Sequence, residues 1–99
     1  MPEWTFLSNH AQVLLCIAQD PDIRLREIGD QVGITERAVH RIVSELADAR
    51  YITRERRGRR NRYTVSHDRS LPEPLAHNQR LGTLLELLGS DSGQHRSST

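Results

Sequence analysis

The chain of 99 residues has room for one domain, with space left for an extra helix and a tail. Hydrophobic residues make up 35% of it, enough for a small core that a partner subunit would help to stabilise. No apolar run approaches the ~20 residues of a membrane span, and a single cysteine excludes an intramolecular disulfide or a cysteine zinc cluster. The opening MPEWTFLSNH lacks the basic-then-apolar plan of a signal peptide, so we expect a cytoplasmic protein with no membrane partner.

Charge is spread unevenly along the chain, although its formal net value is only +1. Residues 1–49 hold four arginines and eight acidic residues, whereas residues 50–62 hold seven arginines against Glu55 alone. Every basic residue is arginine, which suits bidentate contacts with phosphate or guanine. A GC-rich genome would explain the absence of lysine equally well. For a nucleic-acid partner, the distribution of charge matters more than its sum.

The first predicted helix covers residues 9–19, with Ser8 as its N-cap. Residues 13–18, VLLCIA, are apolar without a break, which is more than a helix buried on one side requires. We therefore expect this helix to be covered on two sides. Cys16 lies inside the run and is interpreted as a small core residue, because a redox-sensing thiol needs an exposed, electropositive setting. Proline ends the helix at residue 21, and a very short strand is expected over residues 23–24.

Residues 25–49, LREIGDQVGITERAVHRIVSELADA, are predicted to form two helices joined by one sharp turn. Gly29 lets the two helices approach closely, and Gly33 ends the first of them with a positive φ. Thr35 is the predicted N-cap of the second helix. The inward face of that second helix repeats at i, i+3, i+4 and i+7 and consists of Val39, Ile42, Val43 and Leu46.

A β-hairpin is predicted next, from two β-rich segments over residues 51–56 and 62–65 with an arginine-rich turn over residues 57–61. A last helix is expected from about residue 75 to residue 88, stopped by Gly89. Its apolar stripe, which Leu87 widens, would cover the first helix and consists of Leu81, Leu84, Leu85 and Leu88. The small polar residues at the end of the chain predict a disordered tail.

This order of elements resembles the winged helix-turn-helix of bacterial and archaeal transcriptional regulators. It is most similar to small members of the MarR family, with ArsR-type and IclR-type DNA-binding domains as near relatives. The resemblance covers about residues 6–66, and its specific part is IGDQVGITERAVHRIVSELADARYITRERRGRRNRYTV. It implies an α+β fold that is mainly α with a small β-hairpin wing. The domains would be the winged helix-turn-helix over residues 1–69, a C-terminal helix over residues 70–89 and the tail over residues 90–99.

Two arginines depart from the pattern of these relatives. Arg24 stands where relatives often carry a capping serine or threonine, so the first motif helix would start less firmly. Arg50 stands where they usually carry glycine, and we expect it to adopt a positive φ or to distort the helix end. The strain there would be about 1 kcal/mol.

The resemblance implies that residues 36–50 form a recognition helix in the major groove. Arg37 and Arg41 could each contact guanine bidentately, whereas Glu36 could read cytosine or only balance the helix dipole. The alternative is that this face is merely solvated. The candidate DNA contacts on the helix are Thr35, Glu36, Arg37, His40, Arg41 and Ser44.

The same resemblance implies that the hairpin, residues 56–62, is a wing that lies along the DNA backbone or enters the minor groove. Arg54 could instead pair with Glu55 or with a helix acid, and Arg62 could pack its stem on the sheet. The candidate DNA contacts of the wing are Arg54, Arg56, Arg57, Gly58, Arg59, Arg60 and Arg62.

A homodimer is expected, because operator half-sites one DNA turn apart require two subunits. The C-terminal helix would supply the interface or would only cover the core of its own chain. The candidate interface residues are Val13, Leu81, Leu84, Leu85 and Leu88. A small-molecule effector would find little room except at the dimer cleft.

The sequence therefore predicts a sequence-specific regulator of transcription that binds double-stranded DNA, with repression by promoter occlusion as the default mechanism. The alternative is a winged-helix module that binds RNA or a protein partner without reading a duplex. A protein adaptor would more often expose an apolar patch where Arg37, His40 and Arg41 stand. The histidines lack metal-ligand spacing, and neither a nucleophile with its base nor a phosphate-binding glycine loop is present. We therefore predict no enzyme, no cofactor and no metal site.

Overall fold

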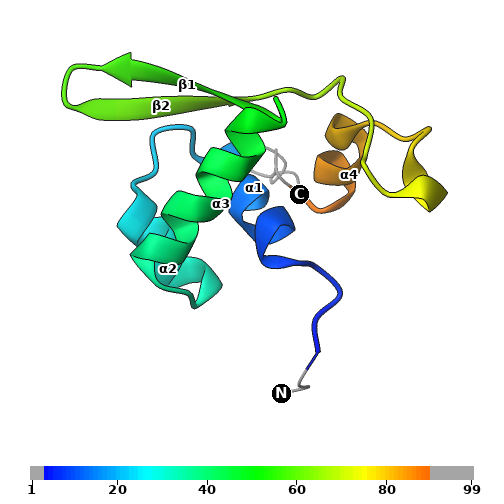
Figure 1. Cartoon of the computed structure of the whole chain (residues 1–99), viewed down its shortest axis with the longest axis horizontal. Coiled ribbons are helices and arrows are strands. Elements are labelled where there is room, and N and C mark those ends of the chain that lie inside the picture. Colours follow the sequence, from blue (N-terminus) through cyan, green and yellow to red (C-terminus); the bar gives the residue numbers. More distant parts are fainter. Residues whose placement is uncertain (1–3, 90–99) are drawn as a thin grey trace, which may run out of the picture.

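The computed structural model describes residues 4–89, in which a hairpin projects from a group of helices (Figure 1). The elements are α1 (Asn9–Gln19), α2 (Leu25–Val32), α3 (Glu36–Asp48), β1 (Ile52–Arg57), β2 (Arg60–Val65), the 3-10 helix η1 (Pro74–Ala76) and α4 (Leu81–Leu87). The mainly helical α+β fold with a hairpin wing is confirmed. The expected disordered tail lies outside the described residues, and the domain boundaries stay a prediction.

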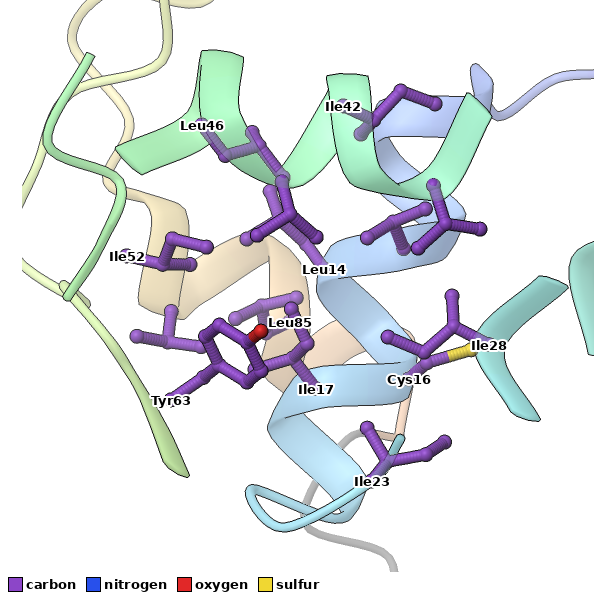
Figure 2. Close-up of a cluster of buried hydrophobic side chains, with 14 of the residues drawn as sticks. Leu14, Cys16, Ile17, Ile23, Ile28, Ile42, Leu46, Ile52, Tyr63 and Leu85 are labelled. Carbon is purple, nitrogen blue, oxygen red and sulfur yellow. The ribbon is translucent and has the colours of Figure 1, made fainter. Parts of the chain in front are cut away.

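Helix α1 has the bounds that the sequence predicts, and its N-cap is Ser8, whose Oγ accepts a hydrogen bond from the backbone N–H of Ala11 at 3.2 Å. Four residues of the apolar run are buried, with Val13 and Ile17 fully so, whereas Leu15 and Ala18 are partly buried. Figure 2 shows Ile17 of α1 and Leu85 of α4 in one buried cluster, to which residues of α2 and α3 also belong. Helix α1 is therefore covered on two sides, as expected.

The turn between α2 and α3 depends on two glycines and a threonine. A Cβ at Gly29 would lie 2.8 Å from the carbonyl oxygen of Ile34, so only glycine fits this approach of chain to chain. Gly33 has φ 87° and ends α2 in the left-handed conformation. Thr35 Oγ1 accepts from the backbone N–H of Ala38 at 3.0 Å and caps α3. All three predictions are confirmed.

The prediction of a short strand over residues 23–24 is wrong, because these residues form a loop before α2. A single backbone hydrogen bond, from the Tyr63 N–H to the Pro21 oxygen at 3.0 Å, joins this loop to β2, and the sheet has two strands. The Arg24 side chain has no hydrogen-bond acceptor and cannot cap α2. Glu27 compensates, because its Oε1 accepts from the Arg24 backbone N–H at 3.0 Å.

Helix α3 ends at Asp48, two residues before the predicted boundary at residue 50. Arg50 has φ 68°, which confirms its predicted left-handed conformation. Its N–H donates to the Ala47 oxygen at 3.0 Å, and the N–H of Tyr51 donates to the Leu46 oxygen at 2.9 Å. These two bonds make a Schellman motif, which normally places glycine where Arg50 stands.

The hairpin turn is tighter than predicted. Arg57 pairs with Arg60, which leaves Gly58 and Arg59 as a two-residue turn and moves Asn61 from the turn into β2. Gly58 has φ 62°, the positive value that the first position of a type II′ turn requires.

The predicted helix over residues 75–88 is wrong in its first half, because α4 begins only at Leu81. The chain between η1 and α4 turns back on the segment after β2, where Leu71 N–H donates to the Gln79 oxygen at 3.0 Å and Leu81 N–H to the Arg69 oxygen at 2.8 Å. A continuous helix would direct the N–H of Leu81 to the oxygen of His77 instead.

The candidate residues of the dimer interface differ in burial. Val13, Leu81 and Leu85 are at most 2% exposed and belong to the core of their own chain. Leu84 is half-buried and Leu88 is exposed. Only these last two candidates remain accessible to a partner subunit.

Cys16 is a core residue, as expected. Its thiol is buried and donates to Oε1 of Gln31 at 3.4 Å. Burial raises the pKa of the Cys16 thiol, which keeps it protonated and unreactive near neutral pH.

Candidate nucleic-acid interface

The outward face of α3 is fixed by its inward face. Val39, Ile42, Val43 and Leu46 are at most 6% exposed and hold the helix against the core. The opposite side therefore turns to solvent, and four of its residues line a shallow hollow: Glu36, Arg37, His40 and Arg41. Ser44 is half-buried and does not line this hollow.

The two arginines of this face have different surroundings. Arg41 Nη1 lies 3.4 Å from Oε2 of Glu45, one helical turn further on, and the Arg41 side chain is 63% exposed. Within residues 4–89, no acidic residue forms an ion pair with Arg37. Arg37 can therefore contact a base edge directly, whereas Arg41 must first break its ion pair with Glu45.

Thr35 adds a donor at the start of α3. Its oxygen is used to accept from Ala38, but its own O–H proton remains available for a phosphate oxygen. The partial positive charge of the helix N-terminus favours an anion at the same place.

The wing is rooted in the core and exposed beyond it. Ile52, Tyr63 and Val65 are buried at the root, at most 9% exposed, whereas the rest of β1 is exposed. Arg54 stands across from Tyr63 in the register and is exposed. Glu55 pairs with Arg57, at 3.4 Å, and not with Arg54 as one interpretation of the sequence held.

Two wing arginines are tied to the loop before α2. Arg62 Nη1 lies 2.9 Å from Oδ2 of Asp22, and Arg60 Nη2 donates to the Asp22 backbone oxygen at 2.6 Å. Arg62 is half-buried, which agrees with the structural role proposed for it. Arg56 also folds back, since its Nε donates to the Gly58 oxygen at 2.9 Å. Arg59 at the tip is exposed.

An open cleft of about 500 Å³ separates the wing tip from the helix-turn-helix. Arginines surround it on both sides, Arg59 and Arg60 from the wing and Arg24 and Arg26 from the start of α2. Glu36 lines the cleft too, and it also lines the hollow on α3, so the two concave surfaces adjoin. The sequence interpretation did not include Arg24 or Arg26.

A signal for these two arginines was present in the sequence. A cation at a helix N-terminus is disfavoured by the helix dipole, and Arg24 cannot cap. Two arginines at such a place are unfavourable for the isolated helix, and an anionic partner would account for them. By contrast, Arg54, Arg56 and Arg57 line neither the cleft nor the hollow.

A second groove, of about 470 Å³, lies within a single chain between α1, the end of α3, and α4. Its floor is apolar and includes Leu14, Leu46 and Leu81, and its rim includes His10 and Glu45. We had expected little room for a small molecule except at a dimer cleft, but this groove lies within one chain.

Between residues 4 and 89, no group of three or more histidine, cysteine, aspartate or glutamate side chains is placed to bind a metal ion. None of the helices described there has the length and apolar character needed to cross a bilayer.

The sequence of residues 8–53 matches the family model described as winged helix-turn-helix DNA-binding. No curated protein sequence matches the chain. The structure is similar to that of the PcaV transcriptional regulator from Streptomyces coelicolor in complex with its natural ligand, with a TM-score of 0.55 and 23% identity over 92% of this chain and 63% of that one. It is also similar to the MarR family protein Rv2887 of Mycobacterium tuberculosis, in complex with salicylic acid, with a TM-score of 0.56 and 19% identity over 94% of this chain and 67% of that one.

The chain therefore spans 63% and 67% of the lengths of these two proteins. The family match begins at the N-cap of α1 and ends in β1, and so contains the whole helix-turn-helix. Both structural matches extend over nearly all of this chain. The chain therefore has the winged helix-turn-helix fold, and residues 8–53 match a DNA-binding family model of that type.

Proposed function

We propose that this protein regulates transcription by binding double-stranded DNA in a sequence-specific manner. The observation that carries the proposal is the continuity of two concave surfaces. The hollow on α3 holds Arg37 and Arg41 and adjoins, at Glu36, the cleft between α2 and the wing. A duplex that places α3 in its major groove would bring its phosphates to the arginines of that cleft.

The two surfaces divide the work of recognition. Arg37 and Arg41 stand on a helix held by buried side chains, so their guanidinium groups can meet guanine O6 and N7 in fixed geometry. Arg26 and Arg59 face the cleft from opposite sides and suit phosphate oxygens, which fix the register without reading sequence. The tie between Asp22 and Arg62 keeps the wing over the cleft.

We infer a homodimer, since two recognition helices are needed for half-sites one DNA turn apart, and Leu84 and Leu88 are accessible for the interface. Repression by occluding a promoter is the simplest effect, because it needs only tight binding. A chromosomal DNA partner implies a cytoplasmic location.

Selection of binding sites from random duplex DNA at near-physiological salt tests the proposal. We expect a palindrome whose half-sites lie about ten base pairs apart. The matched control is the double variant Arg37→Ala with Arg41→Ala, both at exposed positions, which should fold but recover no motif. If the wild-type protein recovers no motif and is retained only weakly, the alternative of an RNA-binding or protein-binding winged helix would replace this one.

A further inference from the structure

Glu45 joins the core helix α1 to the proposed reading face of α3. Its Oε1 lies 2.7 Å from Nε2 of His10 on α1. Its Oε2 lies 3.4 Å from Nη1 of Arg41, and the same Nη1 is 3.5 Å from Oε1. One carboxylate thus has two partners, one in the core helix and the other a candidate base-reading arginine.

The protonation state of Glu45 follows from these partners. The side-chain hydrogen bond with His10 lowers the pKa of Glu45, partial desolvation opposes this, and the charge and hydrogen bond of Arg41 lower the pKa further. An ionised carboxylate only accepts hydrogen bonds, so Nε2 of His10 is the donor. The other titratable residues lining the adjoining groove are Tyr51 and Glu73.

The two contacts are unequal. The bond to His10 is short, whereas the contact of Arg41 is long and its side chain is 63% exposed. An exposed ion pair four residues apart on a helix is weak and can be exchanged for a DNA contact. Because the hydrogen bond from His10 occupies Oε1 of Glu45, it weakens the interaction of the same carboxylate with Arg41.

We propose that Glu45 is a positioning residue that holds Arg41 back from DNA, and that His10 weakens this hold. The inference rests on the proposed DNA binding, and it deepens that function by naming what sets the availability of one reading side chain. If this is correct, neutralising Glu45 and removing His10 must change the affinity for duplex DNA in opposite directions. A carboxylate that acted only through its charge on the DNA would not depend on Arg41 or on His10.

The first experiment is a double-mutant cycle on a labelled duplex that carries the selected site, read by fluorescence anisotropy at fixed salt. Glu45→Gln should tighten binding about threefold, the size expected for releasing an exposed ion pair. The charge-matched control is Asp48→Asn, also exposed and on α3, which removes one negative charge without touching Arg41. In an Arg41→Ala background, the gain from Glu45→Gln should fall to that of Asp48→Asn.

The second experiment removes the other partner. His10→Ala should weaken binding about twofold, because Arg41 then has the carboxylate to itself. The double variant His10→Ala with Glu45→Gln should bind like Glu45→Gln alone. His10 and Glu45 are 43% and 49% exposed, so the fold should tolerate both changes, and thermal unfolding of each variant checks this.

The possible results distinguish the positioning role of Glu45 from the proposed binding of duplex DNA. Duplex binding by the wild-type protein with additive effects of Glu45→Gln and Arg41→Ala would overturn the positioning role alone. Equal binding by His10→Ala and the wild type would overturn the part assigned to His10. Absence of duplex binding by the wild type would overturn the proposed function and this inference with it.

Discussion

The recognition helix α3 and the wing both present arginines, but the protein supports them in different ways. In α3, the four stripe residues from Val39 to Leu46 are buried, so the helix is held against the core along most of its length. In the wing, burial is confined to the root, and most of β1 is exposed. The hairpin extends well beyond the helices that carry it (Figure 1).

This difference indicates what each surface can do. A helix fixed by core packing holds its side chains in one geometry, as bidentate contact with a base requires. A hairpin tied down by Asp22 and a single backbone bond to Pro21 can adjust to the path of a phosphate backbone.

The largest effect should come from emptying the core beneath α3. Ile42 is 1% exposed, and Ile42→Ala should lower the free energy of unfolding by about 2–5 kcal/mol. Thr64→Ala, at an exposed position of the wing, is the control and should change it by less than about 0.5 kcal/mol. Chemical denaturation measures both. Similar losses from the two variants would mean that the wing is as firmly built as the helix.

The second-largest effect should come from removing the side chain of Arg37, the candidate base-contacting arginine. Arg37→Ala should cost about 1–3 kcal/mol of binding to the selected site and relax the preference at one base position. Unfolding should be unchanged, because the side chain is exposed. Repeating the site selection with the variant tests this. A uniform loss at every base position would assign Arg37 to phosphate and remove the distinction from the wing.

The tip of the wing should behave in the opposite way. Arg59→Ala should weaken all duplexes alike, by about fivefold at 0.15 M salt, and lower the slope of log K against log salt by about one unit. Arg69→Ala removes the same charge on the segment after β2, outside the cleft, and should leave the slope unchanged. Salt titrations on specific and random duplexes give the answer. A changed base preference for Arg59→Ala would show that the wing reads sequence.

The sequence predicted best where local chemistry decides the structure. Gly29, Gly33 and Thr35 each have one geometric task in the turn, and the stripe from Val39 to Leu46 can be buried in only one way. For this reason the helix-turn-helix, its caps and its outward arginines could be placed without coordinates. The wing was predicted too, because alternating β-rich segments flank a glycine.

What the sequence missed depends on long-range contacts. The amide of Leu81 could continue a helix or bond to Arg69, and only the packing of the whole chain decides between them. The arginines at the start of α2 face the wing across a cleft that no local pattern describes. Likewise, the partnership of Glu45 with His10 joins residues 35 positions apart in the sequence.

Arg50 lies where the rigid helix gives way to the wing, and it carries the smallest predicted effect. Its φ of 68° strains a residue with a Cβ, so Arg50→Gly should raise the free energy of unfolding by about 0.5–1 kcal/mol. Ala49→Gly is the matched control: residue 49 is right-handed, with φ −82°, so glycine there should destabilise the protein by a similar amount. Chemical denaturation would resolve the opposite signs. If both glycines destabilise, Arg50 is not strained, and the Schellman bonds at the junction hold its conformation at no cost.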